Sequence, residues 1–102
     1  MNGLVAIYRW RVDAEHEQAF IARWERATRH LAQRGGLGSL IGKNAAGELV
    51  AVALWPDQAA REKAFAEGGD EEPWPPAERL EPMLIDPIHD MWRLDQWQEI
   101  TR

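Results

Sequence analysis

The stretch that most constrains this chain is LVAVALW, residues 49–55, an unbroken run of apolar side chains. It lies between the polar turn sequence NAAG, residues 44–47, and Pro56, which lacks a backbone N–H and ends the run. Successive residues of a strand point to opposite faces of the sheet, so a strand that is apolar at every position needs cover on both sides. The sequence therefore predicts a strand over 48–55 with another layer packed on each face.

The remaining elements follow from periodicity and from turn residues. The segment before Asp13 alternates with period two, as a strand does. Apolar residues then recur at helical spacing from Phe20 to Leu31, and the glycines that follow end the pattern. The expected elements are a strand over 4–12, a helix capped by Asp13 and ended by Gly35 and Gly36, strands over 37–43 and 48–55, a helix over 58–67 capped by Asp57, a proline-rich loop over 69–76, a short helix over 77–80 and a last strand over 88–97.

This order, βαββαβ, predicts an α+β fold of the ferredoxin-like kind in residues 1–102, taken as one domain. Right-handed crossovers place both helices on one face of a four-stranded antiparallel sheet. The other face is left open, although the strand over 48–55 carries apolar residues there too. A second copy of the chain is the expected cover, because a self-complementary face gives a closed twofold dimer.

Charge and composition exclude several classes of partner. The chain has 17 acidic and 12 basic side chains, a net charge of −5, which repels nucleic-acid phosphates and anionic membrane surfaces. It has no cysteine, so disulfides, thiolate chemistry and cysteine-ligated metals are excluded. Arg9 and Arg11 interrupt any apolar stretch near the start that could serve for export or membrane insertion. We expect a soluble, cytoplasmic protein that binds neither nucleic acid nor membrane.

Four short motifs carry a resemblance to a known family. They are Phe20-x-x-x-Trp24 in the first helix, GGLGS over 35–39, Trp55-Pro56 at the end of a strand, and the AF pair at the end of the second helix. Together with the element order they resemble the antibiotic biosynthesis monooxygenase family. The resemblance implies a dimeric α/β barrel, formed by two ferredoxin-like sheets, and chemistry that uses no metal or flavin. The substrate implied is a phenol or anthrone, which transfers an electron to oxygen once it has been deprotonated in a dry pocket.

A pocket between sheet and helices is the expected ligand site. In it the Tyr8 hydroxyl would donate to an oxyanion, and the indoles would stack on a flat molecule. Each aromatic side chain could instead fill the core, which leaves a non-catalytic binding protein or a purely structural dimer as the alternative. The expected pocket residues are Tyr8, Phe20, Trp24, Trp55 and Trp74.

The titratable residues give no clear catalytic group. The three histidines, at positions 16, 30 and 89, have no metal-binding spacing, and His89 beside Asp90 is a weak candidate for a general base. The acidic cluster over 70–72 is expected to be solvated. A third reading, heme degradation, is disfavoured. The heme-degrading branch of the family uses an asparagine, a tryptophan and a histidine, and only Trp55 matches, with Tyr8 near the asparagine position and no histidine near Glu78.

Overall fold

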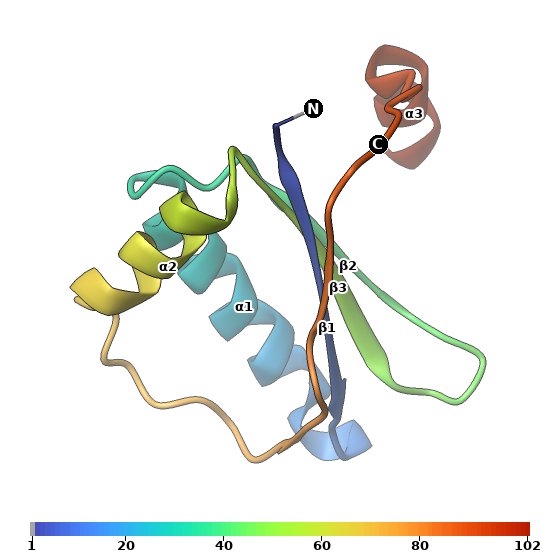
Figure 1. The fold of residues 1–102 in the computed structure, drawn as a ribbon. Helices are drawn as coiled ribbons and strands as arrows, with labels where there is room; N and C mark the ends of the chain where they lie inside the picture. Colours follow the sequence, from blue (N-terminus) through green and yellow to red (C-terminus); the bar gives the residue numbers. More distant parts are fainter. Residues whose placement is uncertain (1) are drawn as a thin grey trace.

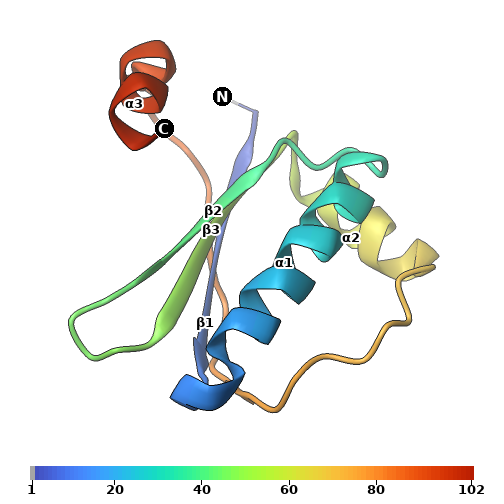
Figure 2. The same cartoon turned by 180° about the vertical axis from the view of Figure 1, so that it is seen from behind.

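The computed structural model describes residues 2–102 and has the α+β, ferredoxin-like architecture expected from the sequence. One antiparallel sheet carries two helices on the same face (Figure 1), and the reverse view shows the same layering (Figure 2). The elements are β1 (Leu4–Arg11), a 3₁₀ turn η1 (Ala14–His16), α1 (Glu17–Ala32), β2 (Ser39–Lys43), β3 (Leu49–Trp55), α2 (Gln58–Glu67), β4 (Glu78–Arg79), β5 (Met83–Ile85) and α3 (Leu94–Thr101).

The strand order is β2-β3-β1, and both β4 and β5 pair with the free edge of β1. Leu4 is opposite Trp55 in the pairing of β1 with β3, and Trp10 is opposite Leu49. Hence β1 and β3 are the two interior strands, and an interior place for β3 agrees with its apolar run over 49–55. Their helix-facing residues form the core with the inner sides of α1 and α2, and the buried members are Leu4, Ala6, Phe20, Ala27, Leu49, Ala51, Trp55 and Ala64.

The two predicted helix caps had different outcomes. The Asp57 carboxylate accepts a 2.7 Å hydrogen bond from the Ala60 amide, so it caps α2 as expected. Asp13 makes no side-chain cap. Its backbone carbonyl accepts from the His16 amide at 2.9 Å, which starts a 3₁₀ turn ahead of α1. The side-chain cap predicted for Asp13 is therefore wrong.

The predictions for the last quarter of the chain are also wrong. Residues 77–80, predicted as a short helix, contain strand β4. Residues 88–97, predicted as a strand, form a coil and the start of helix α3. The fourth strand is instead β4 followed by β5, which lie one after the other along the edge of β1. Pro82 lies between them, and its missing N–H explains the interruption.

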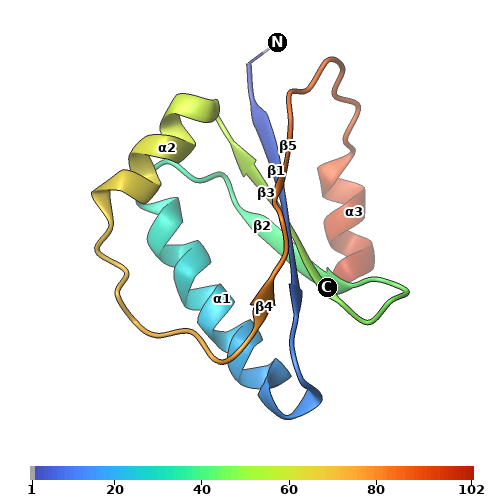
Figure 3. The ribbon, with the colours of Figure 1, turned by 60° about the horizontal axis from the view of Figure 1, so that its bottom comes forward.

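The face of the sheet away from α1 and α2 is open, and α3 lies on that side of the sheet (Figure 3). Alternation places Leu40, Met83 and Ile85 on this face, and these side chains are 40 to 57% exposed. Every residue of α3 is exposed, including Leu94 and Trp97. In residues 2–102 there is no helix of the length and apolar character needed to cross a membrane.

Candidate functional site

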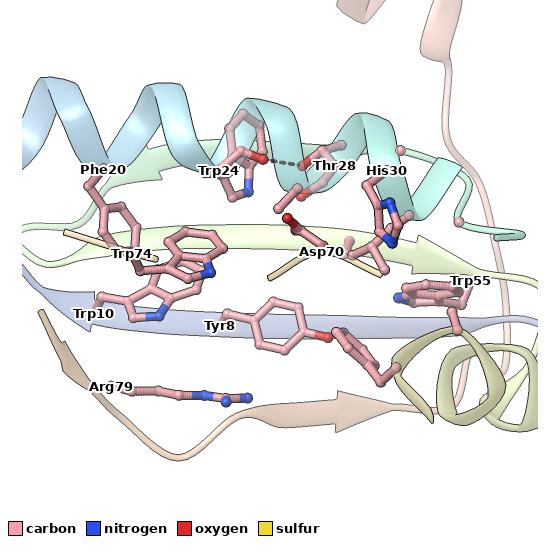
Figure 4. Close-up of a pocket in the computed structure, with 18 of the residues that line it drawn as sticks. Tyr8, Trp10, Phe20, Trp24, Thr28, His30, Trp55, Asp70, Trp74 and Arg79 are labelled. Atoms are coloured by element: carbon pink, nitrogen blue, oxygen red, sulfur yellow. Dashed lines mark hydrogen bonds between the residues drawn. The ribbon is translucent and has the colours of Figure 1, made fainter. Parts of the chain in front are cut away.

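A cavity of about 450 Å³ lies between the helix-covered face of the sheet and the two helices (Figure 4). Strands β1 and β3 form its floor, α1 and α2 form two walls, and the segment 68–77 closes a further side. The floor has room because Ala53 stands on β3 where a larger side chain would fill the space. Gly36 and Gly38, after the end of α1, also lack side chains and line the cavity. The cavity is thus a product of small residues at specific places in a largely aromatic wall.

All five residues expected at the pocket, Tyr8, Phe20, Trp24, Trp55 and Trp74, line this cavity. They come from β1, α1, β3 and the segment 68–77, which the fold brings together. Phe20 and Trp55 are also buried, at 1% and 3% exposure, so a packing role and a place on the cavity wall coexist.

Trp10 also lines the cavity and was not among the residues expected there. Its ring lies 5.0 Å from that of Phe20 in an edge-on contact, and 6.5 Å from Trp74 in a stacked one. Tyr8 stacks on Trp10 at 6.0 Å. The signal was present in the sequence, because period-two alternation places Trp10 on the same face of β1 as Tyr8.

A buried arginine fixes the segment 68–77 to α1. The Arg23 side chain is 1% exposed and donates to both carboxylate oxygens of Asp70, at 3.0 and 2.9 Å. It also donates twice to the backbone carbonyl of Glu72, at 3.1 and 2.8 Å, and lies 4.5 Å from the centre of the Trp74 ring. The acidic cluster over 70–72 is exposed, as expected, but the pairing of Asp70 and Glu72 with arginines was not anticipated.

Further ion pairs support the same attachment. Arg26 donates to the Glu72 carboxylate at 2.9 Å, and this hydrogen bond is the main reason why the pKa of Glu72 is lowered. Desolvation raises the pKa by less than the hydrogen bond lowers it, and the positive charges of Arg26 and Arg23 lower it further. Next to this attachment, Arg34, two residues after the end of α1, pairs with Glu67, the last residue of α2. Segment 68–77 is thus held to α1 by charged contacts, and its Trp74 is fixed as part of the cavity wall.

Two polar groups of the cavity stand out. The indole nitrogen of Trp55 is buried and has no hydrogen-bond partner in residues 2–102. The Tyr8 hydroxyl accepts a 2.9 Å hydrogen bond from Nε of Arg61, on α2. Sequence reasoning missed Arg23 and Arg61, since their partners lie 47 and 53 residues away along the chain.

The histidines are placed differently from the expectation. His89 is exposed, lies in the coil between β5 and α3, and does not line the cavity. His30 does line it, and its Nε2 is 3.0 Å from the Gly68 carbonyl oxygen. A carbonyl can only accept, so Nε2 carries the hydrogen of this bond. Within residues 2–102, no group of three or more His, Asp or Glu side chains is arranged to hold a metal ion.

No family model matches the sequence, and no curated protein matches it either. Solved structures do match. A proposed monooxygenase from Shewanella loihica aligns with a TM-score of 0.67 and 22% identity over 87% of this chain and 97% of its own. SnoaB, a cofactor-independent oxygenase from Streptomyces nogalater, aligns with a TM-score of 0.72 and 16% identity over 89% of this chain and 98% of its own. MupZ from Pseudomonas fluorescens has a TM-score of 0.67 and 14% identity, over 98% of this chain and 78% of its own.

The chain shares the fold of the monooxygenases that its motifs resemble. At these identities the likeness concerns the fold and leaves the reaction to be argued from the cavity.

Proposed function

We propose that this protein binds a flat phenolic or quinonoid molecule in the cavity and, where that molecule is a phenol or anthrone, oxidises it with molecular oxygen, without a cofactor. The volume of about 450 Å³ is in the range of small-molecule sites, roughly 300–1,000 Å³, and the lining is mostly apolar with few polar groups. The fold shared with a cofactor-independent oxygenase supports the same reaction class.

The observation that carries the proposal is the unpaired N–H of Trp55. A buried donor without a partner costs about 1–3 kcal/mol, so such groups are uncommon in folded proteins. Trp55 lines the cavity, and Figure 4 draws its indole nitrogen on the side of the ring that faces Tyr8. An oxygen atom of a bound ligand would supply the missing acceptor.

The proposed reaction follows from the chemistry of an ionised phenol or anthrone. Its anion transfers one electron to oxygen, and the resulting radical and superoxide combine at the ring carbon. For an anthrone, the CH₂ group becomes a carbonyl that keeps one oxygen atom, while the other oxygen leaves as water with the two hydrogens. The protein contributes a dry aromatic site and hydrogen bonds to the anion.

Oxygen uptake with a panel of hydroquinones, naphthols and anthrones tests this proposal. We expect at least one compound to be consumed, and Trp55→Phe to lose binding and turnover because it keeps an aromatic ring but lacks the N–H. Trp97→Phe, which makes the same exchange in exposed α3 and outside the cavity, is the matched control and should keep wild-type ligand binding and oxygen uptake. Uptake at background for every compound would defeat the enzymatic proposal.

Two other functions can be separated from this one. A protein that binds such compounds without consuming oxygen would be the non-catalytic alternative. A purely structural role, with the indoles filling the interior, is disfavoured by the cavity itself. Heme degradation would require a shift of the heme absorption band when hemin is added, and we expect none.

We also propose that the protein is a homodimer joined through the open sheet face. The support is the exposed apolar surface there, including Leu40, Met83 and Ile85, together with the exposed apolar side chains of Trp92 and Trp97 beyond it. Sedimentation at micromolar concentration tests this, and a stable monomer would contradict it. The cytoplasmic location and the assignment of residues 1–102 to one domain stay predictions.

A further inference from the structure

We propose that Arg61 is a positioning residue, which directs the hydroxyl hydrogen of Tyr8 into the cavity so that the site binds the ionised form of a phenol. The inference rests on the proposed function, since it concerns the ligand of the same cavity.

The contact between the two side chains has only one possible direction. Nε of Arg61 lies 2.9 Å from the Tyr8 hydroxyl oxygen. A guanidinium has donors and no acceptor, so Tyr8 must accept this bond through an oxygen lone pair. The hydroxyl hydrogen of Tyr8 is then free to be donated elsewhere. Tyr8 lines the cavity, so a ligand oxygen is the available acceptor.

The position of Arg61 is fixed by its neighbours. Its guanidinium carbon lies 5.7 Å from the centre of the Tyr8 ring and 5.0 Å from that of Phe65, so it is held between two aromatic rings. Packing of this kind limits the rotamers of a long side chain. The donor is thereby held at the hydroxyl before any ligand arrives.

The charge of Arg61 is not neutralised by a carboxylate. Arg23 and Arg34 are each paired with a carboxylate. Within residues 2–102, by contrast, no carboxylate oxygen lies within 4.0 Å of a nitrogen of the Arg61 side chain. A half-buried cation without a counter-ion favours a negative charge nearby. The ligand oxygen on the other side of the Tyr8 hydroxyl is where that charge would lie.

Trp55 supplies a second donor for the same oxygen or for its neighbour. Tyr8 and Trp55 stand on adjacent strands and on the same face of the sheet, and Figure 4 shows the hydroxyl and the indole nitrogen pointing toward each other. The other charged or titratable side chains that line the cavity are His30, Asp70 and Arg79, and Asp70 is already paired with Arg23. Two hydrogen-bond donors with a cation behind one of them suit a phenolate better than a neutral ether or ketone.

The test uses para-nitrophenol, whose neutral and ionised forms differ in colour, and its methyl ether para-nitroanisole, which cannot ionise. We expect wild-type protein to bind para-nitrophenol in its ionised form and to shift the ionisation midpoint of the bound dye to lower pH. Arg61→Met should weaken binding of the ionised dye by about tenfold or more and reverse the shift, with little change in para-nitroanisole binding.

Three further variants complete the design. Tyr8→Phe should lose the preference for the ionised dye while keeping the ring on the cavity wall. Arg61→Lys, which keeps the charge but not the directed Nε–H, should retain part of the shift and provides a second measurement if Arg61→Met folds poorly. Lys63→Met removes a charge from the same helix at a side chain that is 79% exposed, and should match wild type.

The outcomes separate this inference from the proposed function. An unchanged midpoint in Arg61→Met, or wild-type protein that binds neither dye or both equally, would overturn the inference. Because the dye measurement needs no turnover, a clear shift without oxygen uptake would keep the inference and defeat only the oxidation.

Discussion

Two segments follow helix α2, and they differ in how the rest of the chain holds them. Residues 68–77 have no regular secondary structure, yet Arg23 binds Asp70 and the Glu72 carbonyl and so fixes them against α1. Residues 86–102 contain a helix, yet no salt bridge within residues 2–102 involves them, and their large apolar side chains are exposed. One buried arginine thus turns the irregular segment 68–77 into a cavity wall. Helix α3 is regular, but without such a contact its apolar side chains stay uncovered.

The largest loss of stability is expected from removing Arg23, which holds segment 68–77 and has no counterpart in residues 86–102. Arg23→Met deletes four hydrogen bonds from a buried side chain and leaves Asp70 without its partner. We expect the free energy of unfolding to fall by about 3 kcal/mol or more, measured by urea denaturation. Arg29→Met, on the same helix but 75% exposed, should change it by less than about 0.5 kcal/mol. Equal stability of both variants would show that Arg23 does not hold the segment.

Two tryptophans of similar exposure give the next test. Trp74, in 68–77, is 42% exposed and Trp97, in α3, is 48% exposed. Trp74→Ala should cost about 1–2 kcal/mol of unfolding free energy, because it loses contacts with Arg23 and Phe20, and should leave self-association unchanged. Trp97→Ala should leave the fold intact and raise the dimer dissociation constant by about tenfold, measured by sedimentation. If both variants lowered only stability, or both weakened only self-association, segment 68–77 and helix α3 would not differ in the way proposed.

A smaller effect is expected at the start of the attached segment. Gly69 has a φ of +91°, and an added Cβ would lie 3.1 Å from a guanidinium nitrogen of Arg34. Gly69→Ala should cost about 1 kcal/mol, since a side chain disfavours this backbone conformation. Gly42→Ala is the control, because Gly42 has no positive φ and open space around its Cβ position. Thermal unfolding should show a lower midpoint for the first variant only.

The smallest expected effect is a pH dependence of the contact between Glu72 and Arg26. The Arg26 hydrogen bond lowers the pKa of Glu72 in the folded protein, so this contact stabilises above the usual glutamate range, about pH 4.3, and is lost as pH falls through the lower folded value. We expect a small change in the fluorescence of nearby Trp74 on acidification. Glu72→Gln should remove that change. An identical acid titration in the variant would show that another group is responsible.

Much of the fold could be predicted from local pattern. The apolar run over 49–55, the alternation in β1 and the helical spacing from Phe20 gave the two interior strands and α1. The fourth strand could not be predicted in this way. The sequence over 78–85 carries charges and Pro82, and its two short strands are too brief to show a clear alternation. One of the charged side chains, Glu78, pairs with Arg11 across the edge of β1, a contact that the sequence alone does not reveal. The better alternation over 88–97 misled the prediction.

The sequence by itself determined which face of each strand is apolar and which aromatic residues share a face, because these properties depend on period-two and helical spacing alone. The tertiary structure decided the polar part of the site. The bonds of Arg23 to Asp70 and of Arg61 to Tyr8 join residues 47 and 53 positions apart. Contacts at such separation leave no periodic trace in the sequence, and they arise only when packing of the helices on the sheet brings the side chains within hydrogen-bond reach.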